Sequence, residues 1–261
     1  MVDKIQDAQA EKDELSALYE LRPELETPGY WQALSDNCDQ WASEFTVCPL
    51  WRAASENLTR WRQEYRETFG AELLSVGRLP DFVAKSQSSI KNKLARKLRA
   101  EEDLEVILSK TGPPIPQVGD LVRTRVVCKY IDGVEYLTTK LCDLASTMKI
   151  DTKRERQGRL EGYFAQHINF ESDVFYRVGG FPTATRVKCE IQLATDFGTR
   201  MWDATHKLYE VERDKDRDPA AWQWAPSDPR FMANQLGHMM HLADGLLVQL
   251  RGQLIDNKAP K

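Results

Sequence analysis

Two carboxylate residues stand in stretches of the sequence where acidic side chains are uncommon. Asp120 opens a valine-rich run, 121–130, and Glu190 lies in the middle of a second apolar run, 186–193. Acidic residues are depleted in β-strands, so a specific role could keep them there. With nearby Arg and Lys residues they could hold Mg²⁺ and a triphosphate, because carboxylates bind a hard cation that bridges phosphate oxygens. Taken singly, each is also consistent with a solvated strand residue.

Basic side chains gather in the segment 81–108, which has the pattern of a basic amphipathic helix. Ile90 and Leu94 recur at helical spacing and should face the interior, whereas Lys93 and Arg96 project from an adjacent face. Such a face either binds phosphate groups or is simply solvated, and the residue types alone leave both interpretations open.

The elements that must position these residues follow the order helices, strands, helices. Helical spacing of Trp51, Leu58 and Trp61 predicts a core-facing helix within the helical block 30–69. Further periodicity predicts strands at 121–130, 163–174 and 186–193, and helices at 134–144, 197–211 and 230–254. The expected fold class is α/β (α+β), a mixed β-sheet flanked by helices with helical additions at both ends. The expected division is an N-terminal helical region at 1–75, a core at 76–211 and a C-terminal helical region at 212–261.

Composition narrows the class of protein. The 261 residues carry a formal net charge of −4, so only a local basic patch could bind nucleic acid. The N-terminus is acidic and polar, unlike a signal peptide, and every apolar run is too short to cross a bilayer, so we expect a cytoplasmic protein. Five cysteines at irregular spacings predict neither a disulfide framework nor a zinc site. Cys128 and Cys189, inside apolar runs, are expected to be small buried residues.

Four segments, in this order along the chain, resemble the synthetase motifs of the RelA/SpoT family. They are Lys85–Arg96 (KSQSSIKNKLAR), similar to K-x-x-x-S-I-x-x-K-L-x-R; Asp120–Cys128 (DLVRTRVVC), similar to D-x-x-G-x-R-[IV]-V; Gly162–His167 (GYFAQH), similar to G-Y-x-[SA]-x-H; and Glu190–Thr195 (EIQLAT), similar to E-I-Q-x-R-T and followed by Trp202 and His206. The resemblance implies a nucleotidyltransferase-like RelA/SpoT synthetase fold over 76–211. It also implies an ATP-dependent pyrophosphokinase that transfers the β,γ-pyrophosphate of ATP to a ribose 3′-hydroxyl.

The resemblance also implies roles for single residues. The ATP phosphates would be held by Lys85, Ser89, Lys93, Arg96 and Arg125. Asp120 would bind Mg²⁺, and Glu190 would share the metal or accept the proton of the attacking hydroxyl. On the acceptor side, Tyr163 would stack on the base, His167 would contact a phosphate, and Gln192 would line the wall of the site. A reaction of this kind depends on in-line positioning and charge neutralisation more than on covalent help from the protein.

Some positions depart from the family pattern. Val83, Arg123, Phe164, Ala165 and Ala194 stand where the family has Arg, Gly, Arg, Ser and Arg. The presumed metal carboxylates and the stacking Tyr163 are retained. Because three of the changes fall near the acceptor side, the acceptor stays open between a guanosine or adenosine nucleotide and the 3′ end of tRNA.

The basic cluster formed by Lys153, Arg154 and Arg156 precedes Tyr163 and has three interpretations. It could guide an RNA backbone, hold the two phosphates of a nucleoside diphosphate, or be a solvated loop. The chain contains no His-Asp dipeptide, so the hydrolase half of the long family members is not expected. The resemblance is therefore to the small members, either alarmone synthetases or toxins that pair with an antitoxin protein. The alternative hypothesis is a catalytically degenerate member that binds a nucleotide or RNA.

Overall fold

A computed structural model describes residues 15–16, 18–20, 22–99, 108, 115, 118–158, 162–178, 181–213 and 221–256. Its sheet has five strands in the order β1-β2-β5-β4-β3. The strands are β1 (Val83–Ala84), β2 (Val122–Cys128), β3 (Thr152–Gly158), β4 (Phe164–Val178) and β5 (Phe181–Thr195). β1 pairs with β2 in antiparallel fashion, with Ala84 opposite Val122. The chain contacts group into two compact units, each made of three segments that are distant in the sequence.

The first unit is formed by the described residues within Met1–Cys48, Asp81–Thr124 and Asn169–Glu190. It contains η1 (Pro23–Glu26), α2 (Tyr30–Thr46), β1 and α4 (Gln87–Arg99). Aromatic rings fill its interior, where Phe45 of α2 contacts Phe82 and Phe170 with centroid separations of 5.9 and 5.7 Å. The buried Trp41 donates from its indole Nε1 to the carbonyl oxygen of Phe175 at 3.0 Å, which fixes α2 on β4.

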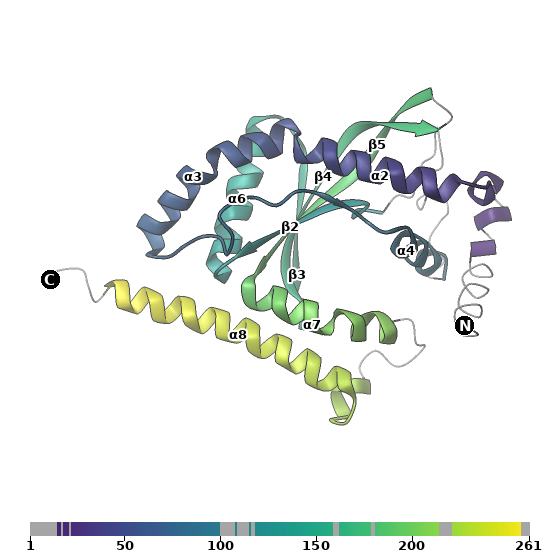
Figure 1. The fold of residues 1–261 in the computed structure, drawn as a ribbon. Helices are drawn as coiled ribbons and strands as arrows, with labels where there is room; N and C mark the ends of the chain where they lie inside the picture. The colour runs from purple at the N-terminus through teal and green to yellow at the C-terminus, as the bar shows by residue number, and fades with distance from the viewer. Residues whose placement is uncertain are drawn as a thin grey trace. The chain divides into compact units, whose positions relative to one another are not determined.

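The second unit is formed by the described residues within Pro49–Pro80, Arg125–Ile168 and Ile191–Lys261. Its helices are α3 (Pro49–Phe69), α6 (Ile131–Thr147), α7 (Asp196–Arg213), η2 (Ala221–Trp224) and α8 (Pro229–Asp256). α7 and α8, drawn in green and yellow, run side by side (Figure 1). Tyr65 of α3 donates to Asp132 of α6 at 2.8 Å, and Arg251 of α8 forms an ion pair with the same carboxylate. These contacts join α3, α6 and α8.

The structure confirms the expected fold class, a mixed sheet with helices that precede and follow its strands in the sequence. It confirms the core-facing stripe of α3, since Trp51, Leu58 and Trp61 are buried. Cys128 and Cys189 are also buried, as expected. Two strands were not predicted. β3 occupies the basic segment for which a loop was one interpretation, and β1 occupies the start of the expected helix.

The predicted helix over 81–108 is therefore wrong at its beginning. Residues 83–84 pair with β2, and α4 begins at Gln87. Ser86 sets this boundary because its hydroxyl accepts a hydrogen bond from the backbone N–H of Ser89 at 3.3 Å, as a helix N-cap does. Residues 100–107 of the predicted helix lie outside the described part of the chain.

Among the described residues, no helix combines the length and the apolar character needed to span a membrane. The division into regions 1–75, 76–211 and 212–261 stays a prediction, because the two units describe compactness and do not test whether any region folds alone.

Candidate nucleotide-binding site

Asp120 is the centre of a charged cluster in the first unit. Lys85 Nζ lies 2.7 Å from its Oδ2 and Lys93 Nζ lies 2.6 Å from its Oδ1, while Arg123 Nη1 is 3.9 Å from Oδ2. β1 places Lys85, whose backbone N–H donates to the carbonyl oxygen of Leu121 at 2.8 Å. α4 places Lys93. Residues 27 and 35 positions away from Asp120 thus meet on one carboxylate.

The cluster carries more positive than negative charge. Burial by itself raises the pKa of Asp120, but Lys93 and Lys85 outweigh it and hold that pKa well below its usual range. Burial also lowers the pKa of Lys85, an effect that the Asp120 carboxylate opposes. Three cations face one carboxylate, so the cluster attracts an anion with several charges, such as a chain of phosphates.

The other predicted ATP-side residues on α4 lie within one turn of Lys93. Ser89 is four residues before it and Arg96 is three residues after it, so both share its side of the helix. The hydroxyl of Ser86 donates to the hydroxyl of Ser89 at 2.9 Å, which places Ser89 in the N-terminal turn. Backbone N–H groups of such a turn carry positive partial charge. Glu190 lies on β5, partly exposed, between the buried Cys189 and Ile191.

Arg125 and Gln192 are neighbours in the second unit. Arg125 was predicted to bind the ATP phosphates and Gln192 to line the acceptor side of the site. Arg125 Nε donates to Gln192 Oε1 at 3.4 Å, and Arg125 Nη1 lies 3.2 Å from Asp203 Oδ1. Asp203, on α7, was not predicted. It follows Trp202 directly in the sequence, but no motif marked it, because its contact with Arg125 spans 78 positions.

Tyr163 and His167 also meet in the second unit. The Tyr163 hydroxyl lies 3.1 Å from His167 Nε2, and the Tyr163 ring lies 4.7 Å from the Trp202 ring with a tilt of 53°. His167 is buried. The structure thus brings together the two acceptor residues that the resemblance implied, and it adds Trp202 as their aromatic neighbour.

The basic cluster belongs to β3, which is an edge strand. Arg154 and Arg156 both form ion pairs with Glu135 of α6, and Gln166 of β4 donates to the same carboxylate at 2.7 Å. Lys153 points to the other face and pairs with Glu155. Side chains of a strand alternate between faces, so Gln166 and its neighbour His167 lie on opposite faces.

The two arginines therefore share a face of the sheet with Gln166 and not with His167. An acceptor-binding role for Lys153, Arg154 and Arg156 stays a prediction. The charges have a second physical reason, because charged side chains on an edge strand discourage pairing with other chains.

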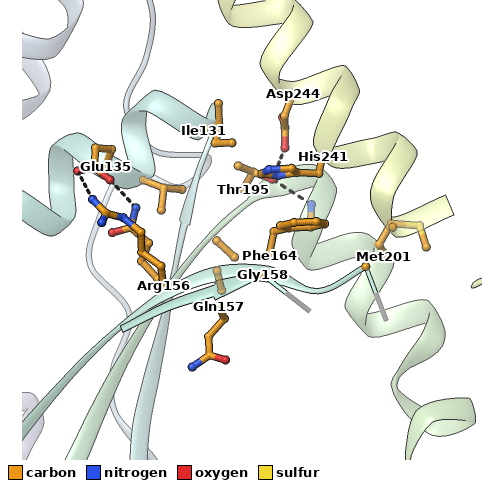
Figure 2. Close-up of a pocket in the computed structure, with 17 residues that line it drawn as sticks. Ile131, Glu135, Arg156, Gln157, Gly158, Phe164, Thr195, Met201, His241 and Asp244 are labelled. Atoms are coloured by element: carbon orange, nitrogen blue, oxygen red, sulfur yellow. Dashed lines mark hydrogen bonds and ion pairs between the residues drawn. The ribbon is translucent and has the colours of Figure 1, made fainter. Parts of the chain in front are cut away.

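A pocket of about 340 Å³ opens in the second unit, lined by residues of α6, β3, β4, β5, α7 and α8. Figure 2 shows Phe164 stacked on His241, with ring centroids 3.7 Å apart and planes at 4°. Beside them the Thr195 hydroxyl donates to Asp244 Oδ2 at 2.5 Å and accepts from the backbone N–H of Gly198 at 3.0 Å. His241 and Asp244 come from α8, which no sequence motif linked to β4.

The environment of this pocket shifts two pKa values. Burial raises the pKa of Asp244 to about 6, against the opposing effect of the Thr195 hydroxyl and with a contribution from Asp196. Burial also lowers the pKa of His241, and His238 adds to that shift. Both shifts favour neutral side chains between α8 and β4.

Two glycines allow α8 to approach the segment Gly162–His167 backbone to backbone. We call this segment the acceptor motif, because Tyr163 and His167 in it are the predicted acceptor residues. Gly162, the first residue of that motif, has φ +72°. A Cβ on Gly237 of α8 would lie 2.5 Å from the Gly162 carbonyl oxygen, and a Cβ on Gly162 would lie 2.9 Å from Gly237 Cα. Both distances are too short for a side chain, so glycine is required on each side of this contact.

Neither a comparison with models of protein families nor one with curated protein sequences gives a match. Solved structures do match. Small alarmone synthetase 1 from Bacillus subtilis, bound to its product pppGpp, shares a TM-score of 0.50 and 15% identity over 83% of this chain and 100% of that chain. A second structure of that synthetase has a TM-score of 0.50 and 16% identity, over 84% of this chain and 99% of that chain.

Small alarmone synthetase 2 from Bacillus subtilis also has a TM-score of 0.50, with 18% identity over 77% of this chain and 93% of that chain. The identities are low, so the likeness concerns the backbone fold. It confirms the resemblance to synthetase domains at that level. The chain therefore has the fold of the small alarmone synthetases.

Proposed function

We propose that the chain is a pyrophosphokinase that transfers the β,γ-pyrophosphate of ATP to a ribose 3′-hydroxyl. The observation that carries this proposal is the convergence of Lys85 and Lys93 on Asp120. A structural ion pair needs one cation for one carboxylate, whereas this cluster holds a surplus of positive charge. In the proposed complex the surplus is matched by the phosphates of ATP.

The lysines are suited to that role by their environment. Only 11% of the Lys85 side chain and 28% of the Lys93 side chain are exposed, so water screens their charge weakly. Charge-assisted hydrogen bonds to phosphate are stronger in such a setting. Arg96 and Ser89, on the same side of α4, would extend the contact along the triphosphate.

Magnesium fits the donors that this site offers. Mg²⁺ in phosphate-transfer sites is typically held by one or two carboxylates, with substrate phosphates and water completing the shell. Within the described ranges, no group of three or more His, Cys, Asp or Glu side chains converges, so a cage made of protein ligands alone is not available there. Asp120, ionised because its pKa is low, and Glu190 would hold the cation, which supplies charge neutralisation on the phosphates.

The proposed step forms one bond and breaks one. The ribose 3′-oxygen attacks the β-phosphorus of ATP, the bond from that phosphorus to the oxygen of the α-phosphate breaks, and AMP leaves. Glu190 accepts the proton of the attacking hydroxyl. Lys85 and Lys93 hold the transferred phosphates in line, which is the main contribution a protein makes to such a transfer.

We propose a nucleotide as the acceptor, with its base against Tyr163. The ring of Tyr163 is held by Trp202 and its hydroxyl by His167, so it is pre-positioned as a stacking surface. A guanosine nucleotide is the first acceptor to test, because pppGpp is the bound product of one structural neighbour. The tRNA 3′ end, with an antitoxin as the protein partner, is the second candidate, favoured by Lys153 and Arg156, which are 77% and 69% exposed.

The test is incubation with γ-labelled ATP and Mg²⁺ together with GDP, GTP, adenosine nucleotides or bulk tRNA in separate reactions. We expect label to appear on a guanosine nucleotide. Label on tRNA alone, lost when Lys153, Arg154 and Arg156 are neutralised, would instead establish the second candidate. Label on none of the acceptors would refute the enzyme and leave the binding-module hypothesis, which predicts ATP binding without transfer.

Variants assign the chemistry to residues. Lys93→Met should lower the transfer rate roughly a hundredfold, because one preorganised cationic donor is lost. Lys91→Met is the matched control, since Lys91 is on the same helix but lies 5.3 Å from the Trp31 ring centre. Glu190→Gln should abolish transfer while circular dichroism shows an intact fold. A fully active Glu190→Gln enzyme would disprove the role of that carboxylate.

A further inference from the structure

One side of α8 is apolar and exposed along most of the length of the helix. Eight large apolar side chains, each between 38% and 72% exposed, lie on this surface. We call it the α8 stripe; it comprises Met232, Leu236, Met239, Leu242, Leu246, Leu247, Leu250 and Leu254. Surface apolar residues that occur singly need no explanation, but a continuous patch of this kind marks an interaction site.

The spacing keeps the stripe on one face of the helix. Apart from Leu247, which lies beside Leu246, the stripe residues from Met232 to Leu254 recur at steps of three or four, averaging about 3.7, which is close to the period of a straight α-helix. A helix of 28 residues is about 42 Å long, so the stripe extends over several turns.

The opposite face of α8 is already occupied within its own unit. Gly237 contacts Gly162, His241 stacks on Phe164, and Arg251 binds Asp132. The stripe is therefore not the face that anchors α8 on the second unit. It is an exposed apolar face on a helix that is already packed through its opposite, more polar face.

The stripe carries no charge. The charged side chains of α8 near the stripe are tied to other partners: Arg230 to Asp228, Asp244 to Thr195 and Arg251 to Asp132. Between Phe231 and Leu250, every exposed position of α8 is apolar or uncharged. A partner with a charged surface would leave its own charges desolvated against this face, which is costly. The fitting partner is a surface that is equally apolar and equally long.

We propose that two copies of the chain associate through their α8 stripes. A two-fold axis places the same face of each copy against the other, so each apolar stripe is buried by the stripe of the other copy. The exposed stripe amounts to on the order of 800 Å², about what one partner contributes to a stable interface of standard size. This inference does not depend on the proposed transfer reaction, because it rests on the outward face of α8 alone.

The first experiment is the mass of the chain in solution by sedimentation equilibrium. We expect about 60 kDa, twice the 30.0 kDa of one chain. The triple variant Leu242→Glu, Leu246→Glu, Leu250→Glu should sediment as a monomer, because burying carboxylates against each other is unfavourable. The matched control is Val47→Glu with Val76→Glu, two apolar residues that are 58% and 63% exposed outside α8, and it should stay dimeric. Circular dichroism verifies the fold of each variant.

The second experiment locates the contact. In a chain whose partly exposed Cys48 and Cys142 are changed to Ser, Leu246→Cys should form a disulfide-linked dimer on mild oxidation and Val76→Cys should not. Leu246 is near the middle of the stripe and meets its counterpart whether the helices run parallel or antiparallel. A wild-type chain of 30 kDa, a triple variant that keeps the wild-type mass, or no cross-link through Leu246→Cys would each overturn the proposal.

Discussion

The carboxylate of Asp120 shows how one residue can serve both the stability of the fold and the proposed chemistry. Its two oxygens accept from Lys93 and Lys85, and only 14% of its side chain is exposed. In the chain without nucleotide, the negative charge of Asp120 offsets the positive charges of Lys85 and Lys93, which would otherwise repel each other. When phosphates bind, the same lysines can turn toward them and the carboxylate is released for a cation.

Asp120→Asn should therefore destabilise the chain itself. We expect the free energy of unfolding at pH 7 to fall by about 2 kcal/mol, because two largely buried ammonium groups lose their counter-charge. The pKa of Asp120 is lowered by folding, so the stabilisation is present above its unfolded pKa of about 4 and is lost as the pH falls further. Urea unfolding at pH 7 and pH 3 should show the gap between wild type and variant narrowing at pH 3.

Asp203→Asn is the control for that experiment. Asp203 also pairs with an arginine, but its side chain is 67% exposed, so we expect a change below about 0.5 kcal/mol. Equal losses in the two variants would show that the lysine cluster has no special energetic weight.

Asp244 predicts the opposite dependence on pH. Its pKa is raised to about 6, so between about pH 4 and 6 the folded chain holds a proton that the unfolded chain releases. Its contribution to stability therefore falls as the pH rises through this range. Asp244→Asn keeps an acceptor for the Thr195 hydroxyl without a charge, and should be more stable than wild type at pH 8 by up to about 2 kcal/mol. Thermal unfolding should show that advantage disappear near pH 4; an advantage that is constant with pH would contradict the raised pKa.

Among the elements, α8 contains two glycines, Gly237 and Gly245, whose surroundings differ sharply in the space they leave for a side chain. Gly237→Ala would place a methyl group 2.5 Å from the Gly162 carbonyl oxygen, so we expect α8 to shift away from the acceptor motif, the chain to lose stability and KM for the acceptor to rise. Gly245→Ala is the matched change, because nothing lies within 4 Å of its Cβ position. It should stabilise the helix by about 0.5–1 kcal/mol. Urea unfolding and acceptor kinetics of both variants test the pair; equal effects would contradict it.

The long elements were predictable because each carries its own periodic signal. α3 repeats its tryptophans at helical spacing, and β5 alternates buried and solvated residues, so both were found from sequence. β1 consists of two residues, which is too short for any period. β3 is dominated by charged residues, and its strand character comes from its neighbour β4 and not from apolar alternation.

The charged cluster around Asp120 was predictable for a related reason. Lys85, Lys93 and Asp120 were singled out by motif, and the structure brings them together. His241 and Asp244 were missed because their partners on β4 and β5 lie dozens of residues away, and because the more apolar face of α8 is its exposed one, so hydrophobic spacing does not reveal which face packs inward. Contacts of that kind are set by tertiary packing and leave no local trace in one sequence.

At the scale of the whole molecule, the two compact units are not consecutive pieces of chain. β2, β4 and β5 each begin in one unit and end in the other. Unfolding one unit would therefore break strands that continue into the other. We expect the units to unfold in one cooperative transition.

Buried thiols can test this cooperativity. Cys38 and Cys189 belong to the first unit and Cys128 to the second, and all three are fully buried. Their reaction with a thiol reagent should begin at the same urea concentration, whereas Cys48 and Cys142, which are partly exposed, should react in the native chain. Distinct midpoints for Cys38 and Cys128 would show that the units unfold separately.

The contact between Gly162 and Gly237 also has a consequence for biosynthesis. Gly237 lies 75 residues after Gly162. The ribosome therefore releases the acceptor motif well before it synthesises the turn of α8 that packs against Gly162. Every residue of the Asp120 cluster leaves the ribosome before α8 is made, but the strands that the two units share keep either unit from folding completely without the other. A nascent chain would therefore reach its folded state, and any activity that depends on that state, only after α8 has emerged.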